Sequence, residues 1–365
     1  MAARAVAEGR LPDGAGPAER VAGFLLALGA DPAEVELARR EDRLDLLVVD
    51  CILFPDGRRY TALEVSDLTG IPPDELRRLW LALGLPDVGD DDPVFTEMDV
   101  EAATTLEGLL LLRMMDDEVA VQLTRVIGSC MARIAEAQIS TTPVARGEAD
   151  PASMAELFAL SADATLPGIA RLLEYAWRRH LRAAARRAML ARGRHGPASA
   201  QVDLTIGFAD LVGFTRMSQE LSAGELSRLI GRFEALAHDT VARQGGRVVK
   251  MIGDEVMYAV DDVGQGVETG LALSEACSGD ELLSDLRVGV AYGPVLTRDG
   301  DCYGTVVNLA SRIVGIALPG SVLVSESVHG ALAGREGLSF SPLRPRTLKD
   351  LGRVRLYRLR RRRDR

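Results

Sequence analysis

The chain has 365 residues, 47% of them apolar and 26% charged, and its net charge at neutral pH is −10. This length is enough for two domains, and the negative charge argues against a protein that binds nucleic acid mainly through a general positive field. The four cysteines lie far apart and form no C-x-x-C pair, so they predict neither a disulfide framework nor a metal site.

The sequence predicts no membrane-spanning segment. The longest apolar runs, residues 21–30 and 109–115, are well short of the ~20 residues that cross a bilayer. The opening residues, MAARAVAEGRLPDG, lack the hydrophobic region of a signal peptide. We therefore expect a soluble protein of the cytoplasm.

The first half of the chain has the apolar spacing of helices, since apolar residues recur at intervals of three and four. A long basic helix is expected from Ile169 to near Gly196, and GPASA after it is typical of a linker. These features predict a helical domain over residues 1–168, a helical linker over 169–200 and a second domain over 201–365.

One segment of this half, YTALEVSDLTGIPPDELRRLWLALGLP, predicts two helices joined by a Gly-Pro turn. Together with the later FTEMDV it is similar to the opening of MerR-type DNA-binding domains, whose second helix enters the major groove. Only Arg77 and Arg78 form a basic pair there, and seven acids in residues 87–101 would repel phosphates. A purely structural pair of helices is the favoured alternative, so DNA binding is not expected.

From Gln201 onward, strands and helices alternate. The apolar pattern predicts a hairpin of two strands over residues 249–260, with a two-residue turn at Gly253 and Asp254. Further strands are expected over residues 202–210, 286–293, 321–326 and 354–359, and helices over 218–244, 267–276 and 305–316. This order predicts an α+β protein whose second domain is a ferredoxin-like α/β sandwich, βαββαβ, with additions.

Two acids mark one edge of this predicted sheet. Asp210 ends the first strand and Asp254 lies in the hairpin turn, so both carboxylates are expected to meet where the central strands lie side by side. Two such groups repel unless a cation neutralises them, and Mg²⁺ or Mn²⁺ prefers oxygen ligands. Single aspartates often only cap turns, but the pair favours a metal site. Their neighbours Phe208 and Ile252 are expected to be core residues.

Polar residues also occur where burial is expected. Lys250 lies inside the first hairpin strand, and Asn308 and Arg312 are four residues apart on a predicted helix, hence on one face. An adjacent apolar stripe of Leu309, Ile313 and Ile316 would pack on the sheet. An arginine can stabilise negative charge that develops on a phosphate oxygen. The alternative for an isolated pair four residues apart is that both side chains are simply exposed on the surface.

Five motifs of the second half resemble, in order and at family spacing, those of class III nucleotidyl cyclase catalytic domains. They span about Val202 to Leu359 and read FADLVGFTRMS, VVKMIGDEVMYAV, LRVGVAYGPV, DCYGTVVNLASRI and LKDLGRVRLYRL. Five motifs over this length are a specific signal. The resemblance implies a catalytic domain that cyclises a nucleoside triphosphate.

The resemblance also implies which residues hold metal and which read the base. Asp210 and Asp254 resemble the two metal-binding aspartates, for two Mg²⁺ or Mn²⁺ ions per site. Lys250 and Asp301 resemble the pair that reads adenine, and spacing favours Asp301 over Asp299. Guanylyl cyclases typically carry Glu and Cys at these positions, so this pair implies ATP. Lysine donates and a carboxylate accepts, which matches adenine and mismatches guanine.

Four further positions match the family. Asn308 resembles the residue that orients the ribose, Arg312 the one that stabilises the transition state, and Arg287 and Lys349 the cations that hold the triphosphate. The implied reaction is ATP to 3′,5′-cyclic AMP and pyrophosphate. Because the family builds its site from two catalytic domains and this chain has one, the resemblance implies a homodimer with two shared sites.

The layout, a helical region joined by a helix to one cyclase domain, resembles the soluble pH-responsive adenylyl cyclases of mycobacteria. It implies a regulatory first half, with His180 and His195 on the basic helix as candidate pH-sensitive groups or as merely exposed ones. The end RLRRRRDR is expected to be frayed and solvated, rather than a contact for anionic lipid or nucleic acid. Two rival functions are a cyclase with relaxed base choice and a DNA-binding regulator whose cyclase-like domain only senses nucleotide.

Overall fold

The computed structural model describes residues 17–54, 58–112, 116–140, 151–195 and 201–362. The chain forms two compact units, Met1–Ala183 and Ala184–Arg365. Among the described residues, no helix combines the length and the apolarity needed to cross a membrane.

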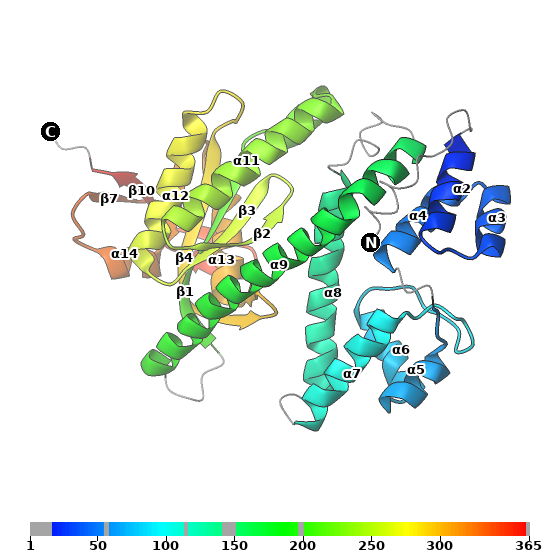
Figure 1. Ribbon diagram of the computed structural model, residues 1–365. Coiled ribbons are helices and arrows are strands. Elements are labelled where there is room, and N and C mark those ends of the chain that lie inside the picture. The colour runs from blue at the N-terminus through cyan, green and yellow to red at the C-terminus, as the bar shows by residue number, and fades with distance from the viewer. Residues whose placement is uncertain (1–16, 55–57, 113–115, 141–150, 196–200, 363–365) are drawn as a thin grey trace. The chain divides into compact units, whose positions relative to one another are not determined.

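The first unit is helical, as predicted (Figure 1). One group of helices packs around Leu25 and Val48, and a second group packs around Val65 and Leu76. The helices are α2 (Pro17–Ala27), α3 (Pro32–Arg40), α4 (Leu44–Leu53), α5 (Ala62–Thr69), α6 (Pro73–Ala82), α7 (Glu97–Leu111), α8 (Asp117–Ser140) and α9 (Pro151–His195).

Helices α5 and α6 form the predicted pair. Thr61 and Glu64 cap the start of α5 reciprocally, and Gly70 ends it in the left-handed conformation, at φ 80°. The two arginines of α6 are engaged by carboxylates: Arg77 binds Asp87 at 2.6 Å, and Arg78 lies 3.1 Å from Glu118. Both basic side chains of the helix are thus neutralised within the unit.

Helix α9 is longer than predicted. It starts at Pro151 rather than near Ile169, and it continues through Pro167. A proline inside a helix removes one backbone hydrogen bond, which is why the sequence favoured a start after this residue. The proposed boundary after residue 168 falls inside α9, the linker GPASA lies outside the described residues, and the three domain bounds stay predictions.

The second unit is built on one mixed sheet. Its strands lie in the order β2-β3-β1-β4-β6-β10-β7, and the short β5 pairs with β4. The strands are β1 (Gln201–Leu211), β2 (Arg247–Ile252), β3 (Glu255–Val260), β4 (Leu286–Arg298), β5 (Asp301–Tyr303), β6 (Ser321–Ser325), β7 (Leu338–Pro342) and β10 (Leu356–Arg361), with β8 (Arg346–Leu348) and β9 (Gly352–Val354) as a separate hairpin. The order of β1 to β4 is that of the predicted ferredoxin-like βαββαβ sandwich.

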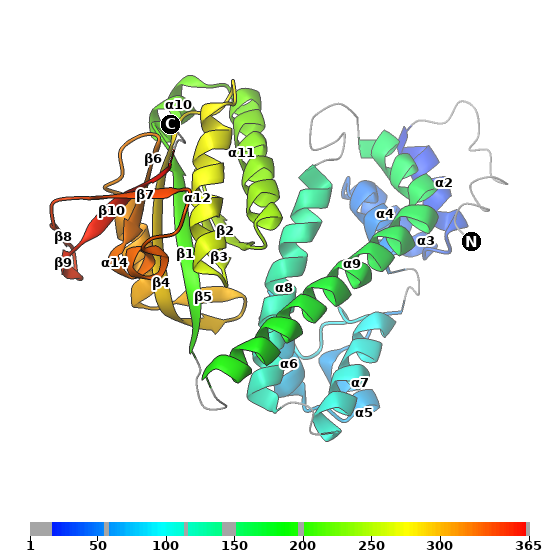
Figure 2. The same cartoon turned by 90° about the vertical axis from the view of Figure 1, so that its left-hand side faces the viewer.

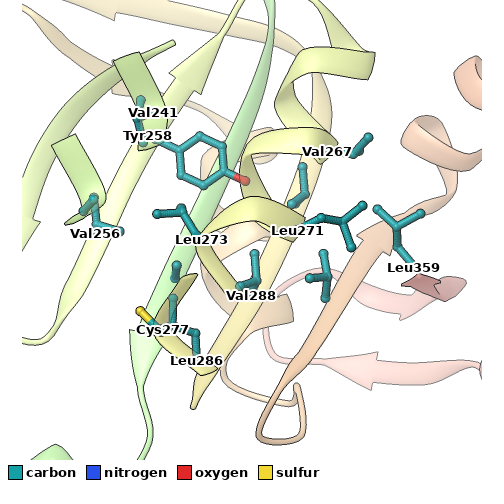
Figure 3. Close-up of a cluster of buried hydrophobic side chains, with 14 of the residues drawn as sticks. Val241, Val256, Tyr258, Val267, Leu271, Leu273, Cys277, Leu286, Val288 and Leu359 are labelled. Carbon is teal, nitrogen blue, oxygen red and sulfur yellow. The ribbon is translucent and has the colours of Figure 1, made fainter. Parts of the chain in front are cut away.

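Helices cover both faces of the sheet. Helices α11 (Ala223–Arg243) and α12 (Val263–Ser278) lie side by side on one face (Figures 1 and 2), with Tyr258 and Phe233 in the core beneath them. Figure 3 shows the Tyr258 ring in this core, and its hydroxyl donates to the Gly266 carbonyl of α12 at 3.1 Å. Helix α13 (Thr305–Val314) covers the other face. Helices α10 (Phe214–Glu220) and α14 (Glu326–Leu332) complete the unit.

Several local predictions were wrong. The helix expected over residues 218–244 is split into α10 and α11, because Ser222 and Glu225 cap a new start. Ile252 is 47% exposed rather than a core residue, since it ends its strand at the open edge, whereas Phe208 is buried. Ile316 is 39% exposed and lies beyond α13.

The apolar face of α13 is accordingly shifted from the predicted stripe: its buried residues are Val306, Ala310, Ile313 and Val314. The basic end was predicted to be frayed, but it is part of strand β10 through residue 361, which includes Arg358 and Arg361. Arg361 is held by ion pairs with Glu268 and Glu275 of α12. Residues 363–365 lie outside the described part.

Gly289 is expected to tolerate no side chain. A Cβ there would lie 2.4 Å from Val314 N and 2.6 Å from Ala310 O, both backbone atoms of α13. Gly289→Ala should therefore push α13 off β4 and destabilise the protein by about 1–3 kcal/mol, seen as a lower melting temperature. Gly224→Ala is the control, because that site on α11 is open and alanine is the better helix former. Equal melting of both variants would contradict this account of the packing.

Candidate functional site

Two of the predicted aspartates meet at one end of the sheet. Asp210 is the last residue but one of β1, where it is directly opposite Glu255 of β3. Asp254 lies in the turn before β3, and its carbonyl accepts from the Leu211 amide at 3.1 Å. Gly253 has φ 63° and Asp254 does not have positive φ, as in a type II′ turn. The turn therefore fixes Asp254 beside Asp210, as the sequence predicted.

Two carboxyls at this end of the sheet, those of Asp210 and Glu255, have raised pKa values. Burial and the neighbouring carboxyl of Asp254, which hydrogen-bonds Asp210, raise the pKa of Asp210 to about 6, although Arg287 acts in the opposite direction. Burial and the charges of Asp210 and Asp254 raise the pKa of Glu255 to about 7. Closely placed, half-buried carboxyls of this kind are relieved when a cation neutralises them.

The donor chemistry fits a hard divalent cation. Asp210 and Asp254 present carboxylate oxygens that already repel each other, which is the ligand type that Mg²⁺ and Mn²⁺ prefer. No group of three or more His, Cys, Asp or Glu side chains among the described residues is arranged to enclose a metal ion. A cation held by two carboxylates has further coordination positions for water or for substrate oxygens.

Arg287 is a cation close to this pair, since its charge acts on Asp210. It is directly opposite Asp210 in the register of β1 and β4, and cross-strand partners point to the same face of a sheet. Its Nε is buried and has no hydrogen-bond partner. A buried guanidinium N–H without a partner is costly, and an anionic ligand would satisfy it.

The second predicted pair is also formed. Lys250 Nζ donates to Asp301 Oδ2 at 2.6 Å, although the two residues are on different strands, β2 and β5. Partial burial would raise the pKa of the Asp301 carboxyl, but hydrogen bonds from Lys250 and from the Cys302 amide outweigh it and keep the pKa below its ordinary value. Asp301 is therefore an ionised acceptor, and Lys250 donates to it.

Asn308 and Arg312 lie one turn apart on α13, as predicted, and both are exposed. The Arg312 guanidinium lies 4.0 Å from the Asp350 carboxylate, and half of its side chain is accessible. Lys349, next to Asp350, is exposed as well. The structure thus places these three residues at the surface of the unit rather than in an enclosed pocket.

Lys250 and Asp210 share one face of the sheet. Lys250 is opposite Met257, and both Met257 and Phe208 are buried in the core under α13. Asp210 is two residues after Phe208, so it points to the same face. That face therefore carries one member of each predicted pair.

Sequence reasoning missed two charged residues near these pairs. Glu255 follows Asp254 directly, and the signal that could have found it is its register opposite Asp210. Arg247 begins β2 and bonds to the loop that carries Asp301. Nothing in the sequence joins Arg247 to that loop, which is more than fifty residues away.

Comparison with protein families gives two matches. Residues 197–361 match the family described as the adenylate and guanylate cyclase catalytic domain. Residues 2–154 match the adenylate cyclase regulatory domain.

Several relatives are similar over most of their length. An adenylate cyclase of Streptomyces coelicolor is 40% identical over 299 residues, which cover 81% of this chain and 75% of that protein. An adenylate cyclase of Streptomyces griseus is 38% identical over 76% of this chain and 69% of its own. A pH-sensitive adenylate cyclase of Mycobacterium tuberculosis is 34% identical over 93% of this chain and 86% of its own.

Solved structures are similar to less than half of the chain. The adenylyl cyclase CyaB of P. aeruginosa is 23% identical, with a TM-score of 0.40, and the match covers 45% of this chain and 96% of that one. The catalytic core of a rhodopsin–guanylyl cyclase with converted specificity, solved with ATPαS, is 23% identical, with a TM-score of 0.42 over 45% of this chain and 98% of its own.

The raised carboxyl pKa values predict a pH dependence. Asp210 and Glu255, with pKa values of about 6 and about 7, bind protons more tightly in the folded protein than in the unfolded chain. Their stabilising contribution is complete below about pH 4 and is lost as the pH rises through these values. Asp210→Asn should therefore stabilise the metal-free protein at pH 8, by roughly 1 kcal/mol because the site is partly solvated.

The same substitution should abolish a cation effect. Mn²⁺ is expected to raise the melting temperature of the wild-type protein more at pH 8 than at pH 5, because protonation competes with the ion. Asp210→Asn should remove this response, whereas Asp239→Asn, on the exposed face of α11, should keep it. Equal Mn²⁺ responses of the wild type and Asp210→Asn would exclude a cation at this carboxylate.

Proposed function

This chain belongs to the adenylate and guanylate cyclase family, and from that membership we propose that it converts ATP to 3′,5′-cyclic AMP and pyrophosphate. The cyclase catalytic domain makes it an enzyme of the adenylate cyclase type, with a regulatory domain in the same chain. The observation that carries the choice of substrate is the contact of Lys250 with Asp301 at 2.6 Å.

That pair suits adenine. Lys250 has three donor positions and uses one for Asp301, so it can still donate to a ring nitrogen. Asp301 is ionised and accepts only, as the 6-amino group of adenine requires. Guanine presents a carbonyl oxygen and a protonated ring nitrogen at these positions, so each contact would be mismatched. A relaxed base choice is less well supported by so tightly placed a pair.

Asp210 and Asp254 are proposed to hold the metal ions, two of Mg²⁺ or Mn²⁺ per site. When bound, these ions lower the pKa of the ribose 3′-hydroxyl and neutralise charge on the triphosphate. Arg287, whose Nε lacks a partner, would bind a phosphate oxygen beside them, and Lys349 would bind another. Asn308 would orient the ribose, so that its 3′-oxygen faces the α-phosphorus in line.

Arg312 is proposed to stabilise the charge that develops at the α-phosphate during attack. It lies with Asn308 on the exposed face of α13, so both can reach a nucleotide held partly by another molecule. We therefore propose a homodimer in which the aspartates of one chain and the remaining residues of its partner form each of two equivalent sites.

The first unit is proposed to regulate the catalytic dimer through α9, which continues from one unit into the other. His180 is exposed on this helix, and the side chain of His195 lies outside the described residues. A pH-sensing role of either histidine stays a prediction. The rival DNA-binding regulator is disfavoured, since Arg77 and Arg78 of α6 are already paired with carboxylates.

The purified protein should produce cyclic AMP from ATP with Mn²⁺ and much less cyclic GMP from GTP. Lys250→Glu combined with Asp301→Cys should lower kcat/KM for ATP by about tenfold or more and favour GTP, because donor and acceptor are exchanged. Asp299→Asn is the matched control, an acid two residues from Asp301 in a turn that asparagine tolerates. A folded wild-type protein that cyclises neither nucleotide would refute the proposed function.

Mixing two inactive chains tests the shared site. Asp210→Ala and Arg312→Ala should each lower turnover about 10²- to 10³-fold or more. When co-expressed, half of the dimers are heterodimers with one intact site, so about a quarter of wild-type activity should return. Each variant expressed alone gives the baseline activity. If mixed chains that form heterodimers stay at that baseline, the site is not shared between subunits.

A further inference from the structure

Arg247 is the first residue of β2 and reaches the loop that carries Asp301. Its Nη1 donates to the Gly300 carbonyl at 2.9 Å, and its Nη2 lies 3.3 Å from Cys302 Sγ. Gly300 and Cys302 are the residues immediately before and after Asp301. One guanidinium thus holds both neighbours of the carboxylate that meets Lys250.

The loop needs such support, because β5 is only three residues long and pairs with β4 alone. Its turn consists of Asp299 and Gly300, both with positive φ, at 55° and 82°. This is the two-residue type I′ turn, which fixes Asp301 opposite Arg298. A hairpin extension this short is marginally stable without further packing.

The contacts of Asp301 depend on where this loop lies. Its Oδ1 accepts from the Cys302 amide at 2.7 Å, and its Oδ2 accepts from Lys250 at 2.6 Å. Two of the roughly four lone-pair positions of the carboxylate remain for a ligand. A shift of the loop would break the link between β2 and β5, because the two strands are not paired by backbone hydrogen bonds.

We propose that Arg247 is a positioning residue for base recognition: its planar fork locks the β4–β5 loop onto β2, so that Asp301 stays in register with Lys250. This inference rests on the proposed function, since it concerns the residues assigned to the base. Lysine could not replace arginine fully, because a single ammonium does not present two parallel donors in a fixed geometry. The charge of Arg247 also helps to keep Asp301 ionised, but the hydrogen bonds from Lys250 and from the Cys302 amide contribute more.

The test compares Arg247→Met and Arg247→Lys with the control Arg243→Met. Arg243 is an exposed residue of α11 four positions earlier, 3.5 Å from Asp239. Arg247→Met should lower the preference for ATP over GTP about tenfold, mainly through a higher KM for ATP, with kcat changed no more than about threefold. Arg247→Lys should fall between the wild type and Arg247→Met. Arg243→Met should behave as the wild type.

A second measurement does not depend on catalysis. In the nucleotide-free protein, backbone hydrogen exchange of residues 298–303 should be about tenfold faster in Arg247→Met than in the wild type or Arg243→Met. Faster exchange with unchanged base preference would overturn the positioning role, and so would unchanged exchange. If the wild-type protein makes no cyclic nucleotide, the proposed function fails, and the exchange of this loop alone decides whether Arg247 holds it.

Discussion

The two-residue turn between β2 and β3 is the constraint on which the candidate site depends. The turn sets the register of the hairpin, and the register decides which side chains of β2 and β3 share a face. It places Asp254 against the end of β1 through the Leu211 amide, and it leaves Lys250 opposite Met257 on the α13 face. A slip of one residue would send Lys250 to the other face and would separate it from Asp301.

The same hairpin carries an electrostatic cost that the fold itself does not need. Asp210, Asp254 and Glu255 converge at a half-buried end of the sheet, where burial and neighbouring carboxylates raise the pKa values of Asp210 and Glu255. Arg287 offsets part of this at Asp210, and its own Nε remains unsatisfied. Strain of this type is typical of a site that is completed by a ligand, because cations and phosphate oxygens would relieve the acids and the arginine together.

Sequence patterns predicted the parts of this structure that local chemistry controls. The Gly253–Asp254 turn and the order of β1 to β4 follow from turn residues and apolar periodicity, and the meeting of Asp210 and Asp254 follows from that order. The motif resemblance supplied Lys250 with Asp301, a pair that periodicity alone does not join. What could not be predicted depends on contacts distant in sequence, such as Arg247 with Gly300.

An irregularity in strand β2 is another feature that the sequence did not predict. Regular alternation would place Val249 and Lys250 on opposite faces, but the register shifts between Val248 and Lys250. This bulge lets Val249 pack in the core under α13 while Lys250 also points to that face. Because the side chains of a regular strand alternate with a period of two residues, the apolar pattern could not reveal this bulge.

The exposed polar face of α13 links the fold to the assembly. One side of this helix is buried against the sheet, with Gly289 permitting close approach to its backbone, so its position is fixed by packing. Asn308 and Arg312 project from the opposite side, and Arg312 lies 4.0 Å from the exposed carboxylate of Asp350. A rigid helix that presents an arginine to solvent gains little from so exposed an ion pair. The arrangement is better suited to docking on a second surface, where water is excluded and the same guanidinium interacts more strongly with a phosphate. The exposed position of Arg312 thus agrees with the proposal that two chains share each site.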